Sequence, residues 1–354
     1  MIHLLLLIAS AAAIYVACEW FVNAVEWLGR RLRVGPLAVG TILAAFGTAL
    51  PESVVTFVAV VFGTGASQKN IGVGAAMGGP LVLATIAYGV TGWMLLARRR
   101  RVRVYTDAMV PVGGPAREAP APRPSLAPRD DLGDLGKLAR DQRWFLAIFA
   151  VKVALGLVAF AIKPWLGLLF FAAYGVYFWR EIRGSGGPGL DEDLQALRLQ
   201  RRRPQPATWA VVTQTLATIG VIFAASQVFV HQLEAIGPML GLPAAVTALL
   251  LSPIATELPE IMNAIIWVRQ GKTRLALANI SGAMMIQATV PSGLGLLFTP
   301  WRFGAALLIS GLATMAAISY LLMLLRTGRF GATTLSLAVV PYLAFAVCLI
   351  PVLA

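Results

Sequence analysis

Two stretches of the sequence each place a glutamate directly after a proline inside an apolar segment. The first reads Leu-Ala-Ala-Phe-Gly-Thr-Ala-Leu-Pro-Glu and ends at Glu52, and the second reads Leu-Ser-Pro-Ile-Ala-Thr-Glu-Leu-Pro-Glu and ends at Glu260. The stretches share leucine, threonine, leucine, proline and glutamate at matching positions. A carboxylate inside a bilayer is costly, so intramembrane acids mark functional positions. The matched pair therefore predicts a site and not a surviving duplication without function.

The residues around each glutamate supply further oxygen atoms. A proline within a helix frees the carbonyl four residues earlier, and here those carbonyls belong to Gly47 and Ala255. Thr48 and Thr256 stand four residues before the two glutamates, hence on the same helix faces. Carboxylate, hydroxyl and carbonyl oxygens suit calcium or sodium better than zinc or copper. The pattern predicts a site for a hard cation.

The second stretch carries an additional acid, Glu257, three residues before Glu260 and on a shared face. Acids this close either share a divalent cation or hold a proton between them. We expect Glu52, Glu257 and Glu260 to be the metal-ligating acids, and either outcome suits an antiporter that exchanges calcium for sodium or protons. Asn279 lines the site or hydrogen-bonds across helices, and Gln287 is an amide ligand or a packing contact.

The chain as a whole has the composition of a membrane protein. Of its 354 residues 58% are hydrophobic and 13% charged, and the mean hydropathy is +0.77. Apolar runs long enough to cross a bilayer recur throughout and leave no polar catalytic domain, no nucleophile–base set and no zinc motif. We therefore expect no enzyme and no cofactor beyond the transported ions.

The net charge of +13 raises the possibility of a nucleic-acid partner. However, most of the 29 Lys and Arg residues fall between the apolar runs on alternate sides, as in cytoplasmic loops of membrane proteins. The expected partners are thus the lipid bilayer and small inorganic cations, and not nucleic acid. The same bias predicts that both termini lie outside, in a bacterial or archaeal cell (inner) membrane.

The predicted fold is an all-α polytopic membrane protein with about ten transmembrane helices. The expected spans are 2–28, 36–63, 68–97, 143–161, 164–180, 207–235, 241–268, 273–299, 303–325 and 331–353. Lys152 falls inside one span, where it snorkels or pairs with an acid.

The two glutamate motifs lie in spans that cross the membrane in opposite directions. This predicts two inverted five-helix repeats with a site between them, as in many secondary transporters. The expected units are helices 1–3 at 1–97, a mostly unstructured cytoplasmic loop at 98–142, helices 4–5 at 143–180, a cytoplasmic linker at 181–206 and the second repeat at 207–354. The end of the loop, from Asp130 to Arg143, is expected to form a short interfacial helix.

These motifs resemble those of a known family. Residues 32–52 resemble the first α-repeat of the calcium/cation antiporter superfamily, which includes the sodium/calcium exchangers and has the pattern Gly-Thr-Ser-Leu-Pro-Glu. Residues 255–260 and 277–282 resemble its second α-repeat. The resemblance implies alternating access, in which helices 1 and 6 slide over cation sites built from helices 2, 3, 7 and 8. It implies that Glu52 and Glu260 are the central acids and that Thr48 and Thr256 help bind ions.

The sequence departs from the family pattern at several positions. Ala49 replaces a serine, and Glu257 stands at the equivalent serine of the second repeat. Where the family has Gly-Ser-Asn and then an Asn or Asp ligand, the chain has Gly78-Gly79-Pro80 with Leu83, and Gly282-Ala283-Met284 with Gln287. The first repeat has therefore lost side-chain oxygens, which argues against a full set of sodium sites.

The main hypothesis is a cation antiporter that extrudes calcium against a gradient of sodium or protons. One alternative keeps the fold and changes the coupling or the cation, to protons, manganese or potassium. The other is a degenerate, non-transporting homologue that acts as a membrane sensor or scaffold, which the lost oxygens of the first repeat motivate.

Overall fold

The structure is a computed structural model that describes residues 2–35, 38–62, 66–108, 132, 134–184, 194–239, 241 and 250–353. Within these ranges the secondary structure is entirely helical, without a strand. Six helices of the described part are long and apolar enough to cross a bilayer. They are Ile2–Leu32, Gly72–Arg100, Thr208–Gln232, Thr273–Phe298, Ala305–Arg326 and Ala332–Val352.

The first half contains long helices interrupted by wider π-helical turns, which often mark functional positions. Its elements are α1 (Ile2–Leu32), η1 (Val39–Ala44), α3 (Ala45–Phe57), η2 (Val58–Phe62), α4 (Ala66–Val82), η3 (Leu83–Ala87), α5 (Tyr88–Ala108), α6 (Leu135–Leu157), η4 (Lys163–Leu166) and α7 (Gly167–Gly184). The segments η1, α3 and η2 follow one another without a gap and occupy the span expected at 36–63.

The second half combines long helices with short helical segments, and its elements η5 and η7 are 3-10 helices. Its elements are η5 (Arg198–Gln200), α8 (Thr208–Met239), α10 (Ser252–Thr256), α11 (Leu258–Arg269), α12 (Thr273–Phe298), α13 (Ala305–Arg326), α14 (Ala332–Ser336), η7 (Leu337–Val339) and α15 (Val340–Leu353). The short helices α10 and α11 together occupy most of the span expected at 241–268.

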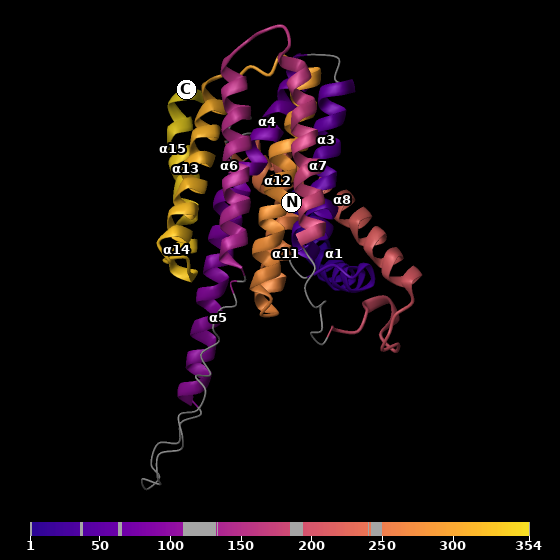
Figure 1. Cartoon of the computed structure of the whole chain (residues 1–354). Helices are drawn as coiled ribbons and strands as arrows, with labels where there is room; N and C mark the ends of the chain where they lie inside the picture. The colour runs from indigo at the N-terminus through magenta and orange to yellow at the C-terminus, as the bar shows by residue number, and fades with distance from the viewer. Residues whose placement is uncertain are drawn as a thin grey trace.

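Two helix boundaries differ from the sequence-based expectation. Helix α5 continues to Ala108, beyond the span end expected at residue 97, and Figure 1 shows it projecting from the bundle. No separate interfacial helix forms in the described part before Arg143, because α6 already begins at Leu135. The side chain of Asp134 caps α6 by accepting a hydrogen bond from the backbone N–H of Lys137 at 2.9 Å. This cap starts the helix well ahead of its apolar part.

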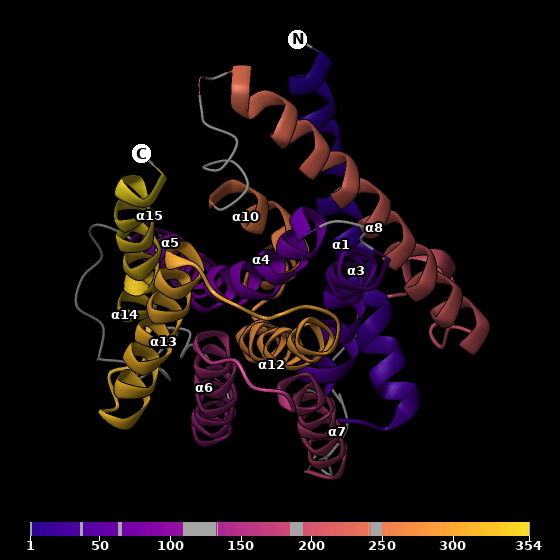
Figure 2. The ribbon, with the colours of Figure 1, turned by 90° about the horizontal axis from the view of Figure 1, so that it is seen from above.

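Helix α12 occupies the middle of the bundle (Figure 2). It packs against α3, α4 and α11 and also against α6 and α7. Nearly all of its side chains are buried, polar ones included. Figure 2 shows the pair α1 and α8 on one flank and α13, α14 and α15 on the other. A central helix that is buried on every side is the natural place for polar groups that must be shielded from lipid.

Two glycines allow η1 to cross α12 at very short range. A Cβ atom added to Gly282 would lie 2.2 Å from the carbonyl oxygen of Thr41. A Cβ atom added to Gly40 would lie 2.7 Å from the Cβ of Ala278. No other residue type fits such a contact, since small residues alone let helix backbones approach this closely. The first and second glutamate-bearing halves therefore touch through their backbones.

Candidate cation site

The helix that carries the second motif is broken at the motif itself. Helix α10 ends at Thr256 and α11 begins at Leu258, so Glu257 lies between them with φ −87° and ψ 3°. Pro259 lacks an N–H and cannot bond the carbonyl of Ala255, which explains the interruption. Glu260 consequently lies in the first turn of α11. The first turn of a helix is a favourable position for an acidic side chain, because the positive end of the helix dipole lies there.

Both acids of this break are buried in the bundle. Glu257 is 0% exposed and Glu260 is 1% exposed. The side-chain amide of Gln287 on α12 donates from Nε2 to Oε1 of Glu257 at 2.7 Å. The structure thus brings Gln287 to the acids, and it joins the broken helix to the central helix of the fold.

Two buried asparagines add neutral oxygen and nitrogen atoms on the same two helices. Asn263 on α11 and Asn279 on α12 are both 0% exposed. Among the described residues neither amide has a hydrogen-bond partner, although buried amides are normally satisfied. Sequence reasoning missed Asn263, and the signal available was its position three residues after Glu260 on the same helix face. The described part of the chain offers no cross-helix partner for Asn279.

The two motif threonines use their hydroxyl protons within their own helices. Thr48 donates to the carbonyl of Ala44 at 3.1 Å, and Thr256 donates to that of Pro253 at 3.1 Å. Each hydroxyl oxygen still has lone pairs with which to accept a hydrogen bond or bind a cation. Thr48 is buried and Thr256 is partly buried.

The first motif lies in a helix that is not broken. Helix α3 runs continuously through Pro51 and Glu52, whose side chains lie outside the described residues. The backbone of Gly47 is tightly covered, because a Cβ there would lie 2.7 Å from Cζ of Phe21 on α1. Among the described side chains, no group of three or more His, Cys, Asp or Glu residues is placed to hold a metal ion. The side chain of Glu52 is not among those described.

Helix α1 covers the second motif and is tied to it by polar contacts. The thiol of Cys18 lies 3.8 Å from the carbonyl oxygen of Pro259. Nearer the end of α1, the carboxylate of Glu26 accepts from the indole N–H of Trp267 at 2.9 Å. Its other oxygen lies 2.5 Å from Nζ of Lys272, in a largely buried ion pair. Helix α1 is therefore fixed to both ends of α11.

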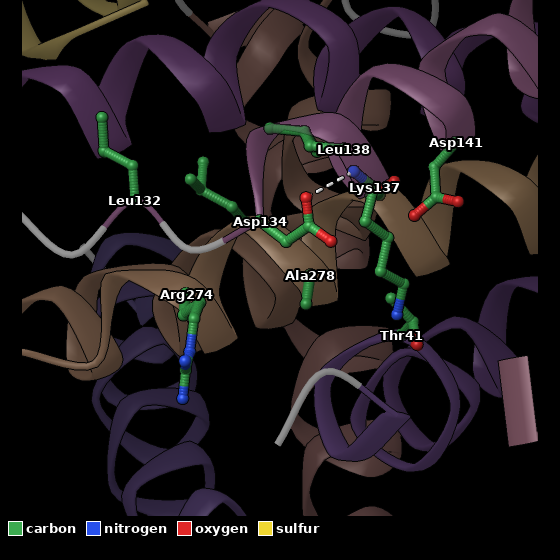
Figure 3. Close-up of a pocket in the computed structure, with 10 residues that line it drawn as sticks. Thr41, Leu132, Asp134, Lys137, Leu138, Asp141, Arg274 and Ala278 are labelled. Atoms are coloured by element: carbon green, nitrogen blue, oxygen red, sulfur yellow. Dashed lines mark hydrogen bonds between the residues drawn. The ribbon is translucent and has the colours of Figure 1, made fainter. Parts of the chain in front are cut away.

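A second buried charged cluster lies where α6 begins. Thr41 of η1 donates to Oε1 of Glu181 at 2.7 Å, and the ammonium of Lys137 pairs with the same oxygen. Figure 3 shows Lys137 reaching toward Thr41, with Arg274 on the neighbouring helix. Burial, and then the nearby Glu181, raise the pKa of Asp141 to about 7. An acid already paired with a lysine is a poor ligand for a transported cation, so this cluster is not the candidate site.

Comparison with known protein families shows to which family the chain belongs. The family model described as sodium/calcium exchanger protein matches residues 2–182 and 209–352, which is most of the chain. The chain belongs to the sodium/calcium exchanger family. It is therefore an integral membrane protein of a transporter family, and members of this family are exchangers and not enzymes.

Two curated relatives resemble this exchanger family member along most of its length. A protein named putative antiporter CaxA from Alkalimonas amylolytica is 25% identical over 93% of this chain and 89% of its own length. The inner membrane protein YrbG of Escherichia coli K12 is 25% identical over 83% of this chain and 79% of its own.

Solved structures of the sodium–calcium exchanger NCX_Mj share the fold. In crystals soaked with Na⁺ and Sr²⁺, that protein matches with a TM-score of 0.70 and 14% identity over 97% of each chain. Crystals soaked with 10 mM Na⁺ and no Ca²⁺ match with a TM-score of 0.69 and 15% identity, again over 97% of each chain. The exchanger-family fold thus extends over nearly the whole chain.

Proposed function

We propose that this chain is a secondary antiporter that exchanges calcium for sodium or protons by alternating access. The observation that carries the proposal is the pair of buried acids, Glu257 and Glu260, at a helix break inside the bundle. Carboxylates inside a membrane bundle mark ion pathways, and their oxygens are ligands that calcium and sodium prefer. Membership in the sodium/calcium exchanger family supports calcium as the cation.

In this proposal the cation is the substrate and lies between the two glutamate motifs. Glu257, Glu260 and Glu52 supply carboxylate oxygens, and Thr48 and Thr256 supply hydroxyl oxygens. The neutral ligands come from the amides Gln287, Asn279 and Asn263 and from the carbonyls of Gly47 and Ala255. A mixed set of charged and neutral oxygens is what calcium prefers.

The proposed transport cycle uses the inverted arrangement of about ten helices that the sequence predicts. Helices α1 and α8 lie together on one flank (Figure 2), and α1 contacts the second motif at Pro259. Movement of this pair relative to α12 would expose the acids to one side and then to the other. The proposed location is a bacterial or archaeal cell membrane with both termini outside.

The test is calcium flux into proteoliposomes under an imposed sodium gradient and, separately, an imposed pH gradient. We expect one gradient to drive calcium movement in the native protein and the Glu260→Gln variant to abolish it. Glu19→Gln is the matched control, because it makes the same change in α1, where the carboxylate accepts from Tyr15. Equal flux in native protein and Glu260→Gln would overturn the proposal.

The other functional candidate is a membrane sensor or scaffold that binds no transported ion. It is favoured by the residues Gly78, Gly79 and Pro80 of α4, none of which has a side-chain ligand. Thermal unfolding of the detergent-solubilised protein with and without millimolar calcium, manganese, potassium or sodium separates the two, because a bound ion stabilises the folded state. A folded protein that responds to none of these cations favours the scaffold.

A further inference from the structure

A groove lies between α1 and α8, on the flank of the bundle that these two helices form (Figure 2). Its volume of about 440 Å³ falls within the range of roughly 300–1,000 Å³ that is typical of ligand sites. The groove is open to the outside, since Val16 on α1 is 53% exposed and Val221 on α8 is 49% exposed. Both helices are long and apolar enough to cross a bilayer, so the groove faces lipid.

Two polar side chains of the groove, Gln214 and Thr218, form hydrogen bonds within the protein. The amide of Gln214 donates to the carbonyl of Trp20 on α1 at 2.8 Å and accepts from the N–H of Leu199 in η5 at 2.8 Å. The hydroxyl of Thr218 donates to the carbonyl of Gln214 at 2.7 Å. The groove therefore presents mainly hydrocarbon surface, which gains dispersion contacts when an alkyl chain fills it.

A run of three arginines lies at one end of this groove. Leu199 lines the groove, and Arg201, Arg202 and Arg203 follow in the exposed segment that leads to α8. Helix α8 then begins with Trp209, which is 62% exposed. Because exposed tryptophans at the ends of membrane helices lie at the membrane–water interface, the arginines lie at the level of the lipid headgroups. Guanidinium groups there bind phosphate by paired hydrogen bonds.

The described charge at this end of the groove is positive. Arg31 of α1 donates to a backbone carbonyl of the segment before α8 and brings a fourth guanidinium group to it. The two acids of α1, Glu19 and Glu26, accept hydrogen bonds from a tyrosine and a tryptophan. The sequence has no Asp or Glu between residues 194 and 233, and the acidic run at 191–193 lies outside the described residues. An anionic headgroup complements this charge, and a neutral one does not.

We propose that the groove between α1 and α8 is a binding site for one anionic phospholipid. The arginines hold the phosphate, and one acyl chain lies along the groove from Leu199 towards Val221. This direction leads from the start of α8 into the bilayer, as the chain of a lipid in that leaflet does. A free phosphate compound would use only the arginines, and a neutral lipid only the groove. The site does not depend on the proposed function.

The test is native mass spectrometry of the detergent-solubilised protein with added dioleoyl phosphatidylglycerol, which resolves the number of lipids bound to each chain. We expect one lipid to bind before any weaker additional ones. Dioleoyl phosphatidylcholine has the same chains without net charge and should bind about 10-fold more weakly. A large excess of glycerol 3-phosphate, which lacks the chains, should not displace the lipid. Equal binding of the two lipids, or displacement by glycerol 3-phosphate, would overturn the proposal.

The variant Arg201→Gln/Arg202→Gln tests the headgroup contact at exposed positions, where the fold does not depend on the side chains. We expect its affinity for phosphatidylglycerol to fall about 30-fold, since each arginine near an anionic headgroup contributes roughly fivefold. Arg326→Gln/Arg329→Gln is the matched control, because it removes two exposed arginines at the end of α13, on the opposite flank. An unchanged affinity in the first variant contradicts the proposal.

The variant Ala217→Phe tests the position of the acyl chain. Ala217 is exposed and lines the groove, so a phenylalanine there would occupy the space of the chain. We expect the affinity to fall about 10-fold, which corresponds to the contacts of one or two methylene groups. Leu216→Phe is the control, because Leu216 is exposed but does not line the groove. Equal affinities in the two variants would rule out a chain in the groove. A mass of two chains without lipid would assign the groove to a second copy and also overturn the proposal.

Discussion

The two inner helices that follow the glutamate motifs, α4 and α12, differ sharply in what they bury. Helix α12 buries Asn279 and Gln287 along its length, together with hydroxyl side chains. The corresponding stretch of α4, from Gly74 to Val82, carries no polar side chain, and a Cβ on Gly78 would lie 2.7 Å from Cγ of Pro253. The second half therefore supplies polar groups, and the first supplies close packing. Two segments that follow the same sequence motif therefore need not carry the same polar groups.

The largest expected effect tests whether the second half of the chain contributes most of the cation-binding groups. Glu260→Gln should reduce calcium flux by about 100-fold, because truncating a buried charged group costs about 2–5 kcal/mol of binding. The double variant Glu260→Gln/Gly78→Ser adds a hydroxyl to α4. It should not recover calcium flux, since Pro253 leaves the new side chain no room. Flux measured in proteoliposomes checks both, and recovery in the double variant would contradict the asymmetry.

The second prediction concerns the glycine contact between the halves. Gly282→Ala should lower the free energy of unfolding by about 3 kcal/mol, because its Cβ meets the carbonyl of Thr41 at 2.2 Å. Gly74→Ala on α4 is the matched control, since no neighbouring atom of the described residues lies within 4 Å of the added Cβ. Thermal unfolding in detergent measures both. Equal midpoints would show that η1 and α12 do not touch as described.

The third prediction addresses the amide of α12. Gln287→Ala should weaken calcium binding about 10-fold, because the hydrogen bond to the carboxylate of Glu257 is lost. Ser292→Ala on the same helix is the control, since its buried hydroxyl has no hydrogen-bond partner among the described residues. Calcium titration of the two variants checks the difference. A larger loss in Ser292→Ala would place the site farther along α12.

The smallest expected effect lies in the charged cluster that joins η1 to α6 and α7. The pKa of Asp141 is raised from 3.8 to about 7, so the folded state holds this proton more tightly than the unfolded state does. The carboxyl therefore destabilises the fold increasingly from about pH 4 to about pH 7, and fully above that. Asp141→Asn should raise the unfolding midpoint by a few degrees at pH 8 and leave it unchanged near pH 4.

Asp134→Asn is the matched control for this change, because asparagine also caps a helix and the position is exposed. It should change the pH dependence of unfolding far less than Asp141→Asn does, because Asp134 makes the smallest contribution to the raised pKa of Asp141. Calcium flux at a fixed pH should be equal in both variants. A loss of flux in Asp141→Asn would connect the cluster to the cation site.

Local sequence signals predicted the buried acids of the second motif, because these residues lie close together in the sequence. Glu260 lies three residues after Glu257, and both are buried as intramembrane acids of this kind are expected to be. Gln287 was left open between ligand and packing contact, because its hydrogen bond to Glu257 joins residues on two helices. Periodicity within a helix cannot specify such a contact between helices.

The features that escaped prediction depend on tertiary contacts or on local backbone chemistry. The cluster of Thr41, Lys137 and Glu181 joins three segments that are far apart in sequence. Lys152 was expected to snorkel or to pair with an acid, and its hydrogen bond to the carbonyl of Ala76 was not predicted. This bond forms where α6 packs against the proline-containing part of α4. The apolar pattern placed the start of α6 too late because it ignores the cap at Asp134.

The close approach of η1 to α12 at Gly40 and at Gly282 has a mechanical consequence. Two backbones that touch without intervening side chains cannot slide or rotate past one another by small rotamer changes. The segment η1 and helix α12 should therefore move as one rigid unit, with Asn279 and Gln287 of α12 held at a fixed depth. Any change in which side the acids face must then come from helices that surround this unit and not from deformation within it.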